Sequence, residues 1–526
     1  MSQPASDKLD RGVIVVASVV VIGAIMSILD TTIVNVALAT LGRELHASLS
    51  TIQWVASGYL VALAVVIPMT GWASERFGAK QLWMFVVGMF VLGSALSGLA
   101  WSAGSLIFFR ILQGLGGGMI MPAGMTILAQ AAGPQRIGRV MSIVGAPMLL
   151  GPILGPVLGG LILQDLSWRW IFYVNVPIGA VALVMALKLL PETTPQRGER
   201  LDLAGVALLS PGLAAIVFGL SEIATQGGIG HLGAWGPILA GVGFVVGFVW
   251  HALHTTARKP LLDLTLFRSP GFSASAVAVF LIGAALFGSL ILLPLYLQVD
   301  RGESTLGTGL LLTPQGIGAA LTMPISGRLT DRIGGGPIVL FGLIVMTAAT
   351  IPLTALTGHT PYTAISAILF ARGIGLGCSM MPAMASAYTT IARSAIPRAT
   401  TALNVLQRVG GSIGTALLAV VLEQQIKAAI PHAVALSGGS VQPIPEPIRL
   451  RIAEPLAQAF GNTFWWAAGL TAVAIAPAIV LASKARVAAP RAPGTAGAPG
   501  GTGASSAERA PATPAPQQEG AGAARA

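Results

Sequence analysis

Long apolar runs recur along the chain, separated by short polar segments that carry most of its charges. A helix needs about 20 consecutive apolar residues to cross the hydrocarbon core of a bilayer, so each run is long enough to span a membrane. The runs predict fourteen spans, at residues 13–39, 50–72, 81–100, 104–130, 138–163, 170–190, 203–222, 232–254, 271–297, 306–327, 337–357, 361–390, 398–424 and 462–483. The sequence therefore predicts an all-α polytopic membrane protein with about 14 transmembrane helices.

The basic residues predict the orientation of these spans, because Lys and Arg accumulate in cytoplasmic loops. With the N-terminus inside, six of the 30 Lys and Arg residues lie outside and three lie within spans, which leaves 21 inside. The outside residues are Arg43, Arg169, Arg301, Lys427, Arg449 and Arg451. Those within spans are Arg110, Arg372 and Arg408. This asymmetry predicts a multi-pass membrane protein with both termini in the cytoplasm. The richness in Ala, Gly and Pro indicates a GC-rich bacterial genome, so we expect the membrane to be a bacterial inner (plasma) membrane.

The composition agrees with a membrane protein and excludes several other classes. Of 526 residues, 54% are hydrophobic and 9% are charged, whereas a soluble domain carries about 25% charged residues. The loop asymmetry accounts for the net charge of +11, so we expect no nucleic-acid partner. The first apolar run is interrupted by Asp30 and lacks a small-residue cleavage site, so we interpret it as a mature helix rather than a signal peptide. Residues 1–12 are a predicted cytoplasmic N-terminus, and the Ala-, Pro- and Gly-rich segment 487–526 is a predicted disordered cytoplasmic tail.

The sequence offers no site for enzymatic or cofactor chemistry. Cys378 is the single cysteine, so neither an internal disulfide nor a metal-thiolate set can form. His251 and His254 lie three residues apart without a third ligand, which favours an interfacial position over a metal site. No lysine follows the glycine pattern of a phosphate-binding loop, and no catalytic constellation is present. We therefore predict that the chain is not an enzyme and holds no cofactor or metal.

An internal repeat divides the chain into two six-helix halves. The loop after the second span reads GWASERFGAK from Gly71 to Lys80, and the loop after the tenth reads GRLTDRIGGG from Gly327 to Gly336. Both place a glycine, an acid followed by Arg, and a second glycine at the same offsets. The fourth and twelfth spans also correspond, with an Arg, a glycine series and then Met-Pro-Ala in each. We predict a first half at 13–190, two inserted helices at 203–254 and a second half at 271–483.

Two ionisable residues stand out within the first half. Asp30 is the only carboxylate deep inside one of its spans, and a charge there costs about 2.5–3.5 kcal/mol on insertion scales. An isolated intramembrane acid is functional by default, although a purely structural pair with a neighbouring helix is the alternative. Arg110 also lies within a span and requires a partner or a wet cavity. It either pairs structurally with a group such as Gln113 or lowers the pKa of a nearby carboxylate during proton transfer.

The fifth span carries a run of glycines and prolines. Gly151, Gly155 and Gly159 are spaced four apart and form one smooth helical face, while the prolines of this span permit bending. Close packing against another helix follows from this pattern whatever the function.

These motifs together resemble the major facilitator superfamily, in particular its fourteen-helix drug–proton antiporter branch. The resemblance runs from about residue 12 to 484. It rests on LDTTIVNVAL (29–38), on the 71–80 loop, on 110–118, on GPILGPVLGG (151–160) and on WRWIFYVNVPIG (168–179). Ala39, Glu75 and Ala79 depart from the family pattern. These departures affect the local energetics of the loops and not the assignment to the family.

The resemblance implies roles for the residues at the matching positions. Proton coupling and substrate handling would involve Asp30, Asn35, Arg110 and Gln113. Gating would involve Gly71, Glu75, Arg76, Gly78 and Lys80, with Asp331 and Arg332 as the weaker copy. Glu75 and Arg76 would form ion pairs on the cytoplasmic side that hold an outward-open state. A hinge between the halves, typical of exporters rather than importers, would be formed by Gly151, Gly155, Pro156, Gly159 and Gly160.

The predicted function is proton-coupled efflux of small hydrophobic or cationic drugs by alternating access. One deep acid favours neutral or monovalent cationic substrates over dications. The alternative is a dedicated exporter of an endogenous metabolite, antibiotic, siderophore or lipid. A sensor would need an effector domain that the chain lacks. The expected partners are small-molecule drugs, protons and the lipid bilayer, and a periplasmic adaptor protein stays open. Arg372 and Arg408 are interpreted as structural or pore-lining.

Overall fold

The apolar runs of the sequence form helices in the computed structural model of the chain, which describes residues 10–133, 136–193, 195, 200–226, 232–255, 260–430 and 446–488. The first part comprises α1 (Arg11–Glu44), α2 (Leu49–Val66), η1 (Ile67–Met69), α3 (Thr70–Phe77), α4 (Ala79–Gly98), α5 (Ala103–Ala132), α6 (Ile137–Asp165), α7 (Trp170–Tyr173), α8 (Asn175–Leu189), α9 (Leu203–Gln226) and α10 (Leu232–His254). The remainder comprises η2 (Leu264–Arg268), α11 (Pro270–Leu295), η3 (Tyr296–Asp300), α12 (Thr305–Ile333), α13 (Gly335–Thr350), η4 (Ile351–Ala355), α14 (Tyr362–Gly377), α15 (Met380–Thr389), η5 (Arg393–Ala395), α16 (Ile396–Ala429), α17 (Glu446–Val473) and α18 (Ile475–Ala488). These described residues contain no strand.

Local sequence explains where several of these helices begin and break. Ser48 and Ser304 precede α2 and α12, and each side-chain oxygen accepts a hydrogen bond from a backbone N–H of the first turn. Ser102 and Ser105 form a reciprocal capping box at the start of α5. The second span is divided into α2, η1 and α3 at Pro68, because proline lacks the N–H that a continuous helix needs.

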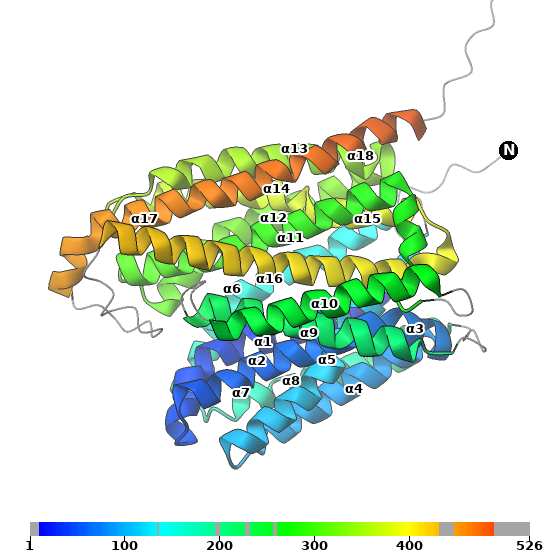
Figure 1. Ribbon diagram of the computed structural model, residues 1–526, viewed down its shortest axis with the longest axis horizontal. Coiled ribbons are helices and arrows are strands. Elements are labelled where there is room, and N and C mark those ends of the chain that lie inside the picture. The colour runs from blue at the N-terminus through cyan, green and yellow to red at the C-terminus, as the bar shows by residue number, and fades with distance from the viewer. Residues whose placement is uncertain are drawn as a thin grey trace, which may run out of the picture. The chain divides into compact units, whose positions relative to one another are not determined.

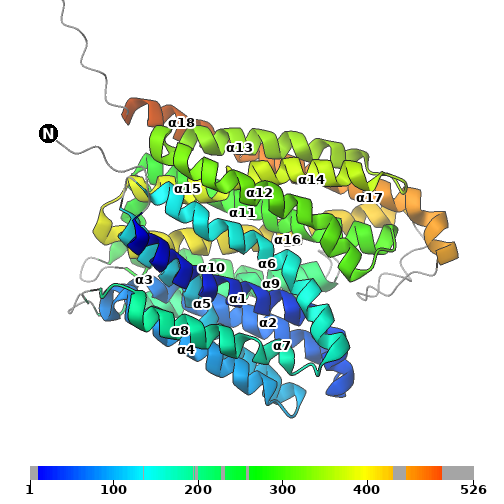
Figure 2. The same cartoon turned by 180° about the vertical axis from the view of Figure 1, so that it is seen from behind.

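Twelve helical stretches among the described residues are long and apolar enough to cross a membrane. The predicted spans 138–163 and 306–327 are not among them, but they form α6 and α12, each 29 residues long. Both helices run through the bundle beside the others (Figure 2). The all-α polytopic class is therefore confirmed, whereas the number fourteen is not. The last span also begins earlier than predicted, at Ile452 rather than residue 462.

We divide the helices into two sets at the inserted pair α9 and α10, following the sequence repeat. Helices α1–α8, which we call the first half, pack on one another, as do α11–α18, the second half. The two groups lie side by side, blue to cyan and green to orange (Figure 1). Helices α9 and α10 pack together, and α9 contacts both α2 and α16. Trp54 of α2 stacks on Phe218 of α9 with ring centroids 5.4 Å apart. The tail predicted at 487–526 lies outside the described residues except for its first two, which end α18.

One end of the bundle concentrates basic residues, and two of them, Arg139 and Arg398, form ion pairs with the opposite half. Helix α1 begins there and α18 ends there (Figures 1 and 2). We call it the basic end, and its defining residues are Arg76, Lys80, Arg139, Arg332 and Arg398. The common position of the start of α1 and the end of α18 agrees with an even number of crossings.

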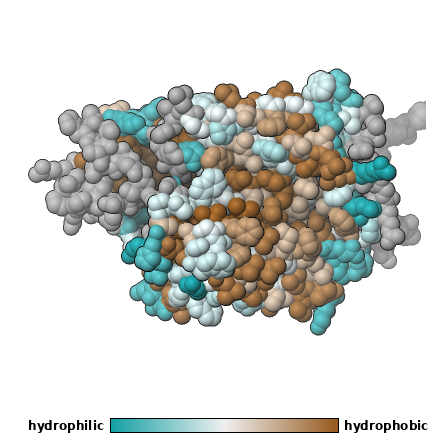
Figure 3. Space-filling view, turned by 60° about the horizontal axis from the view of Figure 1, so that its bottom comes forward, coloured by the Kyte–Doolittle hydropathy of each residue, from teal (hydrophilic) through white to brown (hydrophobic). Residues whose placement is uncertain are grey.

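Hydrophobic side chains cover the middle of the visible face, and hydrophilic ones gather toward its two ends (Figure 3). Large apolar side chains such as Phe85 on α4, Val246 on α10 and Phe341 on α13 are exposed. A water-soluble protein rarely exposes so many large apolar groups together. This surface is the one expected for helices in contact with lipid tails.

Candidate functional site

Asp30 lies in the interior of the first half, on α1, and forms an ion pair with Arg110 of α5. Arg110 NH1 is 2.7 Å from Asp30 Oδ2. The two side chains are buried, with exposed fractions of 0% and 1%. Removing two charges from water is costly, and close contact together with further hydrogen bonds offsets that cost. The sequence analysis left the partners of Asp30 and Arg110 unidentified, and the structure shows that the two residues pair with each other.

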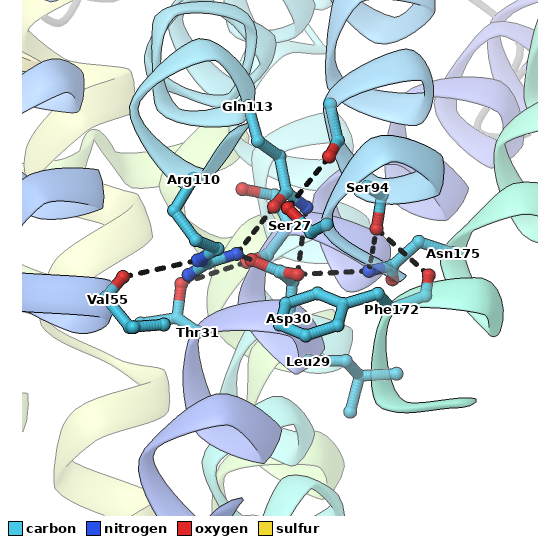
Figure 4. A network of polar contacts seen from close by, with 12 residues as sticks. Ser27, Leu29, Asp30, Thr31, Val55, Ser94, Arg110, Gln113, Phe172 and Asn175 are labelled. Carbon is cyan, nitrogen blue, oxygen red and sulfur yellow. Dashed lines mark hydrogen bonds and ion pairs between the residues drawn. The ribbon is translucent and has the colours of Figure 1, made fainter. Parts of the chain in front are cut away.

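Two amides complete the polar shell of the carboxylate (Figure 4). Gln113, one turn after Arg110, donates to Asp30 Oδ1 at 2.9 Å and accepts from Arg110 NH1 at 2.6 Å. Asn175, the first residue of α8, donates to the same Asp30 oxygen at 3.0 Å and to Ser94 Oγ at 3.0 Å. Ser94 of α4 in turn donates to the carbonyl oxygen of Phe172. Asp30, Gln113, Asn175 and Ser94 are all buried.

Arg110 also ties the cluster to α2. Its Nε donates to the carbonyl oxygen of Val55 at 3.3 Å, and its guanidinium carbon lies 4.1 Å from the ring centroid of Tyr59. The Asp30 carboxylate is thus contacted directly from α5 and α8, and its network reaches α2 through Arg110 and α4 through Asn175. A proton on Asp30 would remove the negative charge that balances Arg110. The polar contacts that link α1, α2, α4, α5 and α8 would then change.

Sequence reasoning missed Asn175 and Ser94. Asn175 is the single amide side chain in the segment 168–179, within an apolar run. A lone amide at such a position was the feature that could have indicated a buried polar contact. The structure does not bring Asn35 to the cluster, since its side chain is exposed five residues beyond Asp30 on α1. Arg372 and Arg408 belong to the second half, where Arg372 is buried on α14 and Arg408 is exposed on α16.

The basic end is closed by an ion pair between the halves. Arg398 of α16 donates from Nε to Glu75 Oε1 and Oε2 at 3.1 Å each, and from NH2 to Oε2 at 2.9 Å. Both side chains are buried. The sequence analysis placed Glu75 in a gate but did not single out Arg398. Nothing near residue 398 marks it as the partner of a position 323 residues away.

A second bridge joins the halves between α12 and α6. Arg139 Nε donates to Asp331 Oδ2 at 2.9 Å, and the backbone N–H of Gly138 donates to Asp331 Oδ1 at 2.8 Å. Asp331 lies beyond the predicted span 306–327, and burial raises the pKa of its carboxyl, against the lowering effect of the Arg139 side chain. The acid of each repeat loop therefore contacts the opposite half.

The other basic residues of these loops behave differently. Lys80 pairs with Glu192 at 2.8 Å, inside the first half. Arg76, expected to pair beside Glu75, forms no hydrogen bond or ion pair within the described part of the chain. Arg332 lies in the last turn of α12.

The glycines of the repeat serve the same purposes in both copies. A Cβ on Gly71 would lie 3.2 Å from the Cα of Arg398, and one on Gly327 would lie 2.9 Å from the Cα of Arg139. Gly78 and Gly334, each seven residues later, have φ angles of 89° and 84°. Only glycine adopts such angles readily. The sequence repeat is therefore also a repeat of backbone geometry.

The glycine face of α6 packs on α1 rather than between the halves. A Cβ on Gly151 would meet Ile28, one on Gly155 would meet Thr32, and one on Gly159 would lie 3.4 Å from the Cα of Ile33. These α1 residues flank Asp30. A Cβ on Gly160 would have nothing within 4 Å, and Pro156 is described only as part of the helix. The resemblance implied an inter-half hinge, but these contacts lie inside the first half.

Among the described residues, no three His, Cys, Asp or Glu side chains converge as a metal-ligand group. His251 Nε2 instead lies 2.9 Å from Asp202 Oδ1, which joins α10 to the segment just before α9.

The comparisons with known proteins agree with this architecture. The model of the Major Facilitator Superfamily matches residues 20–415. The chain belongs to this superfamily. It is 39% identical over 492 residues to the multidrug resistance protein B homolog of Mycobacterium tuberculosis, covering 90% of this chain and 91% of that one. It is 32% identical to the tetracenomycin C resistance and export protein of Streptomyces glaucescens, covering 78% of this chain and 76% of that one.

A solved structure supports the fold. The human organic anion transporter MFSD10 superposes with a TM-score of 0.58 at 16% identity, covering 88% of this chain and all of that one. At that identity the likeness concerns the fold alone. The superfamily and the named relatives place this chain among multi-span membrane transporters of small molecules, in the drug-efflux branch.

Proposed function

We propose that this superfamily member exports small hydrophobic drugs, monovalent cationic ones included, across the bacterial inner membrane in exchange for protons. The observation that carries the proposal is the buried Asp30–Arg110 pair with its amide shell. A carboxylate and a guanidinium inside the membrane are costly and typical of ion pathways and proton relays. The named relatives, which are multidrug resistance and antibiotic export proteins, support the substrate class.

Protonation of Asp30 is the coupling step in this proposal. The ionised carboxylate is bound by Arg110, Gln113 and Asn175, from α5 and α8. A proton on Asp30 removes the charge that holds Arg110 NH1 at 2.7 Å. The contacts that α1, α5 and α8 make through this carboxylate then weaken together. The glycine face of α6, which packs on the α1 residues on either side of Asp30, carries the change along α1.

Alternating access uses the two inter-half bridges. The basic end faces the cytoplasm in this proposal, and the pairs Glu75–Arg398 and Asp331–Arg139 close it. Their opening exposes the space between the halves to the cytoplasm. A membrane potential supplies about 2.3 kcal/mol per charge per 100 mV. Exchange of one proton for a neutral molecule uses both this potential and the pH gradient.

A dedicated exporter of an endogenous antibiotic or other metabolite is the second candidate. The similarity to the tetracenomycin C resistance and export protein favours it. Both candidates use the same fold and the same acid, so they differ only in the breadth of the substrate range. A periplasmic adaptor protein is compatible with either.

Ethidium efflux from energised cells tests the proposal. Cells would express wild type, Asp30→Asn or Asp165→Asn at equal membrane levels, with and without a protonophore. Asp165 ends α6, is exposed and serves as the matched Asp→Asn control. We expect protonophore-sensitive efflux from wild type and Asp165→Asn, and none from Asp30→Asn. Unchanged efflux by Asp30→Asn would contradict coupling at Asp30, and no efflux by wild type would favour the dedicated exporter.

A further inference from the structure

A cavity of about 120 Å³ lies within the second half, between α11, α12 and α14. Leucines form half of its wall, among them Leu286, Leu293 and Leu376. Three polar side chains enter the same wall, one from each helix: Ser289, Gln315 and Arg372. A mostly apolar cavity with a few polar groups is the usual form of a small-molecule site.

Arg372 is the unusual member of this set. Its side chain is 3% exposed, and its Nε is buried without a hydrogen-bond partner. Within the described part of the chain, Arg372 forms no hydrogen bond or ion pair. Arg110, at the corresponding place in the first half, has Asp30 at 2.7 Å. The repeat therefore keeps the buried arginine in both halves but supplies an acid for only one of them.

A buried guanidinium without a counter-charge is costly, and an arriving anion removes that cost. The fork of Arg donors matches a planar carboxylate through two parallel hydrogen bonds. The Gln315 amide offers further donors beside it. Ser289 already donates to the carbonyl oxygen of Ala285 at 2.7 Å, so it contributes a polar oxygen rather than a free proton. The leucines leave room for an apolar body.

We propose that the Arg372 cavity binds the carboxylate of a small amphiphilic acid, with the apolar part of the molecule against the leucine wall. The inference rests on the proposed function in one respect, namely that the bound acid is a transported substrate. It extends the proposed substrate class to carboxylic acids. Asp30, the only deep acid of the first half, is already neutralised by Arg110 and therefore does not repel an anionic substrate. Exchange of a proton for a monoanion moves two elementary charges, so an inside-negative potential drives both movements.

Equilibrium dialysis of the purified full-length protein tests the site without requiring transport. The probes are 2-naphthoate and its neutral analogue 2-naphthamide, at a pH at which the acid is ionised and in chloride-free buffer. The variants are Arg372→Gln, Arg372→Lys and Arg328→Gln, the last being an exposed arginine of α12 that matches the change in net charge. We expect wild type and Arg328→Gln to bind naphthoate about 10-fold or more tightly than naphthamide. Arg372→Gln should lose this preference, and Arg372→Lys should keep part of it.

Equal binding of the two probes by wild type overturns the proposal, and so does a preference that survives in Arg372→Gln. The wild-type comparison decides the matter even where Arg372→Gln does not fold. Displacement of naphthoate by an equal concentration of chloride would show a site for inorganic anions and would contradict one for carboxylates. Failure here leaves protonophore-sensitive efflux intact, whereas failure of proton coupling leaves naphthoate binding intact. The two proposals are thus tested separately.

Discussion

Arg398 of α16 donates hydrogen bonds to both carboxylate oxygens of Glu75 on α3 at 2.9–3.1 Å, and this contact joins the two halves at the basic end of the bundle. Breaking a buried pair by removing one partner costs about 3–5 kcal/mol, because the remaining charge stays buried and unpaired. The pair can therefore decide which conformation of the transporter is more populated.

Replacing Glu75 by Gln should open the basic end. Spin labels at Gln81 and Ser394, which are exposed in opposite halves, report the separation in a Cys378→Ser background. We expect the distance distribution of Glu75→Gln to shift toward longer distances than that of wild type. Glu192→Gln is the matched control, because Glu192 is an exposed acid that pairs with Lys80 inside one half. An unchanged distribution in Glu75→Gln would mean that the pair does not hold this end closed.

The glycine face of α6 should tolerate no side chain where it meets α1. In Gly155→Ala the new Cβ would collide with Thr32, and such overpacking costs about 1–3 kcal/mol. We expect lower thermal stability of the purified protein and slower efflux. Gly160→Ala is the control, because that position has space for a Cβ and alanine favours the helix. Equal stability of the two variants would contradict the packing described here.

Loss of the Asn175 side chain should reduce stability and efflux, whereas loss of the Asn35 side chain should not. Asn175→Ala removes one donor to Asp30 and one to Ser94. A hydrogen bond to a charged group contributes about 1.5–3 kcal/mol, so we expect a measurable fall in both stability and efflux. Asn35→Ala is the same substitution on an exposed α1 side chain. A loss of efflux in Asn35→Ala with none in Asn175→Ala would reverse this assignment and restore the role that the family resemblance implied.

Much of the fold follows from the sequence because the bilayer imposes strong constraints. Apolar runs of about 20 residues predict helices, and the predicted spans are helical in the structure. The repeat loops also predict local geometry, as the matching φ angles of Gly78 and Gly334 demonstrate. The exact ends of the helices are harder to predict. Helix α17 begins at Glu446, well before the predicted span. Hydropathy alone does not locate the start of a helix that extends beyond the apolar run.

The candidate site was only partly predictable. Asp30, Arg110 and Gln113 are conspicuous because charged and polar groups are rare inside spans. Which groups pair could not be derived, because Asp30 and Arg110 are 80 residues apart in the chain. Glu75 and Arg398 illustrate the same limit at longer range. Asn175 was overlooked because a single amide in an apolar run has many structural uses, and Asn35 was included because it shares a motif with Asp30 although the helical turn directs it elsewhere.

The most direct test of proton coupling at Asp30 uses purified protein in vesicles that enclose a pH-sensitive dye, with ethidium added outside. The account predicts that ethidium entry through wild type and Asp165→Asn makes the lumen more alkaline, because each ethidium exchanges for a proton. Asp30→Asn should give no such change. Ethidium entry through wild type without a change of pH, or the same alkalinisation with Asp30→Asn, would contradict the account.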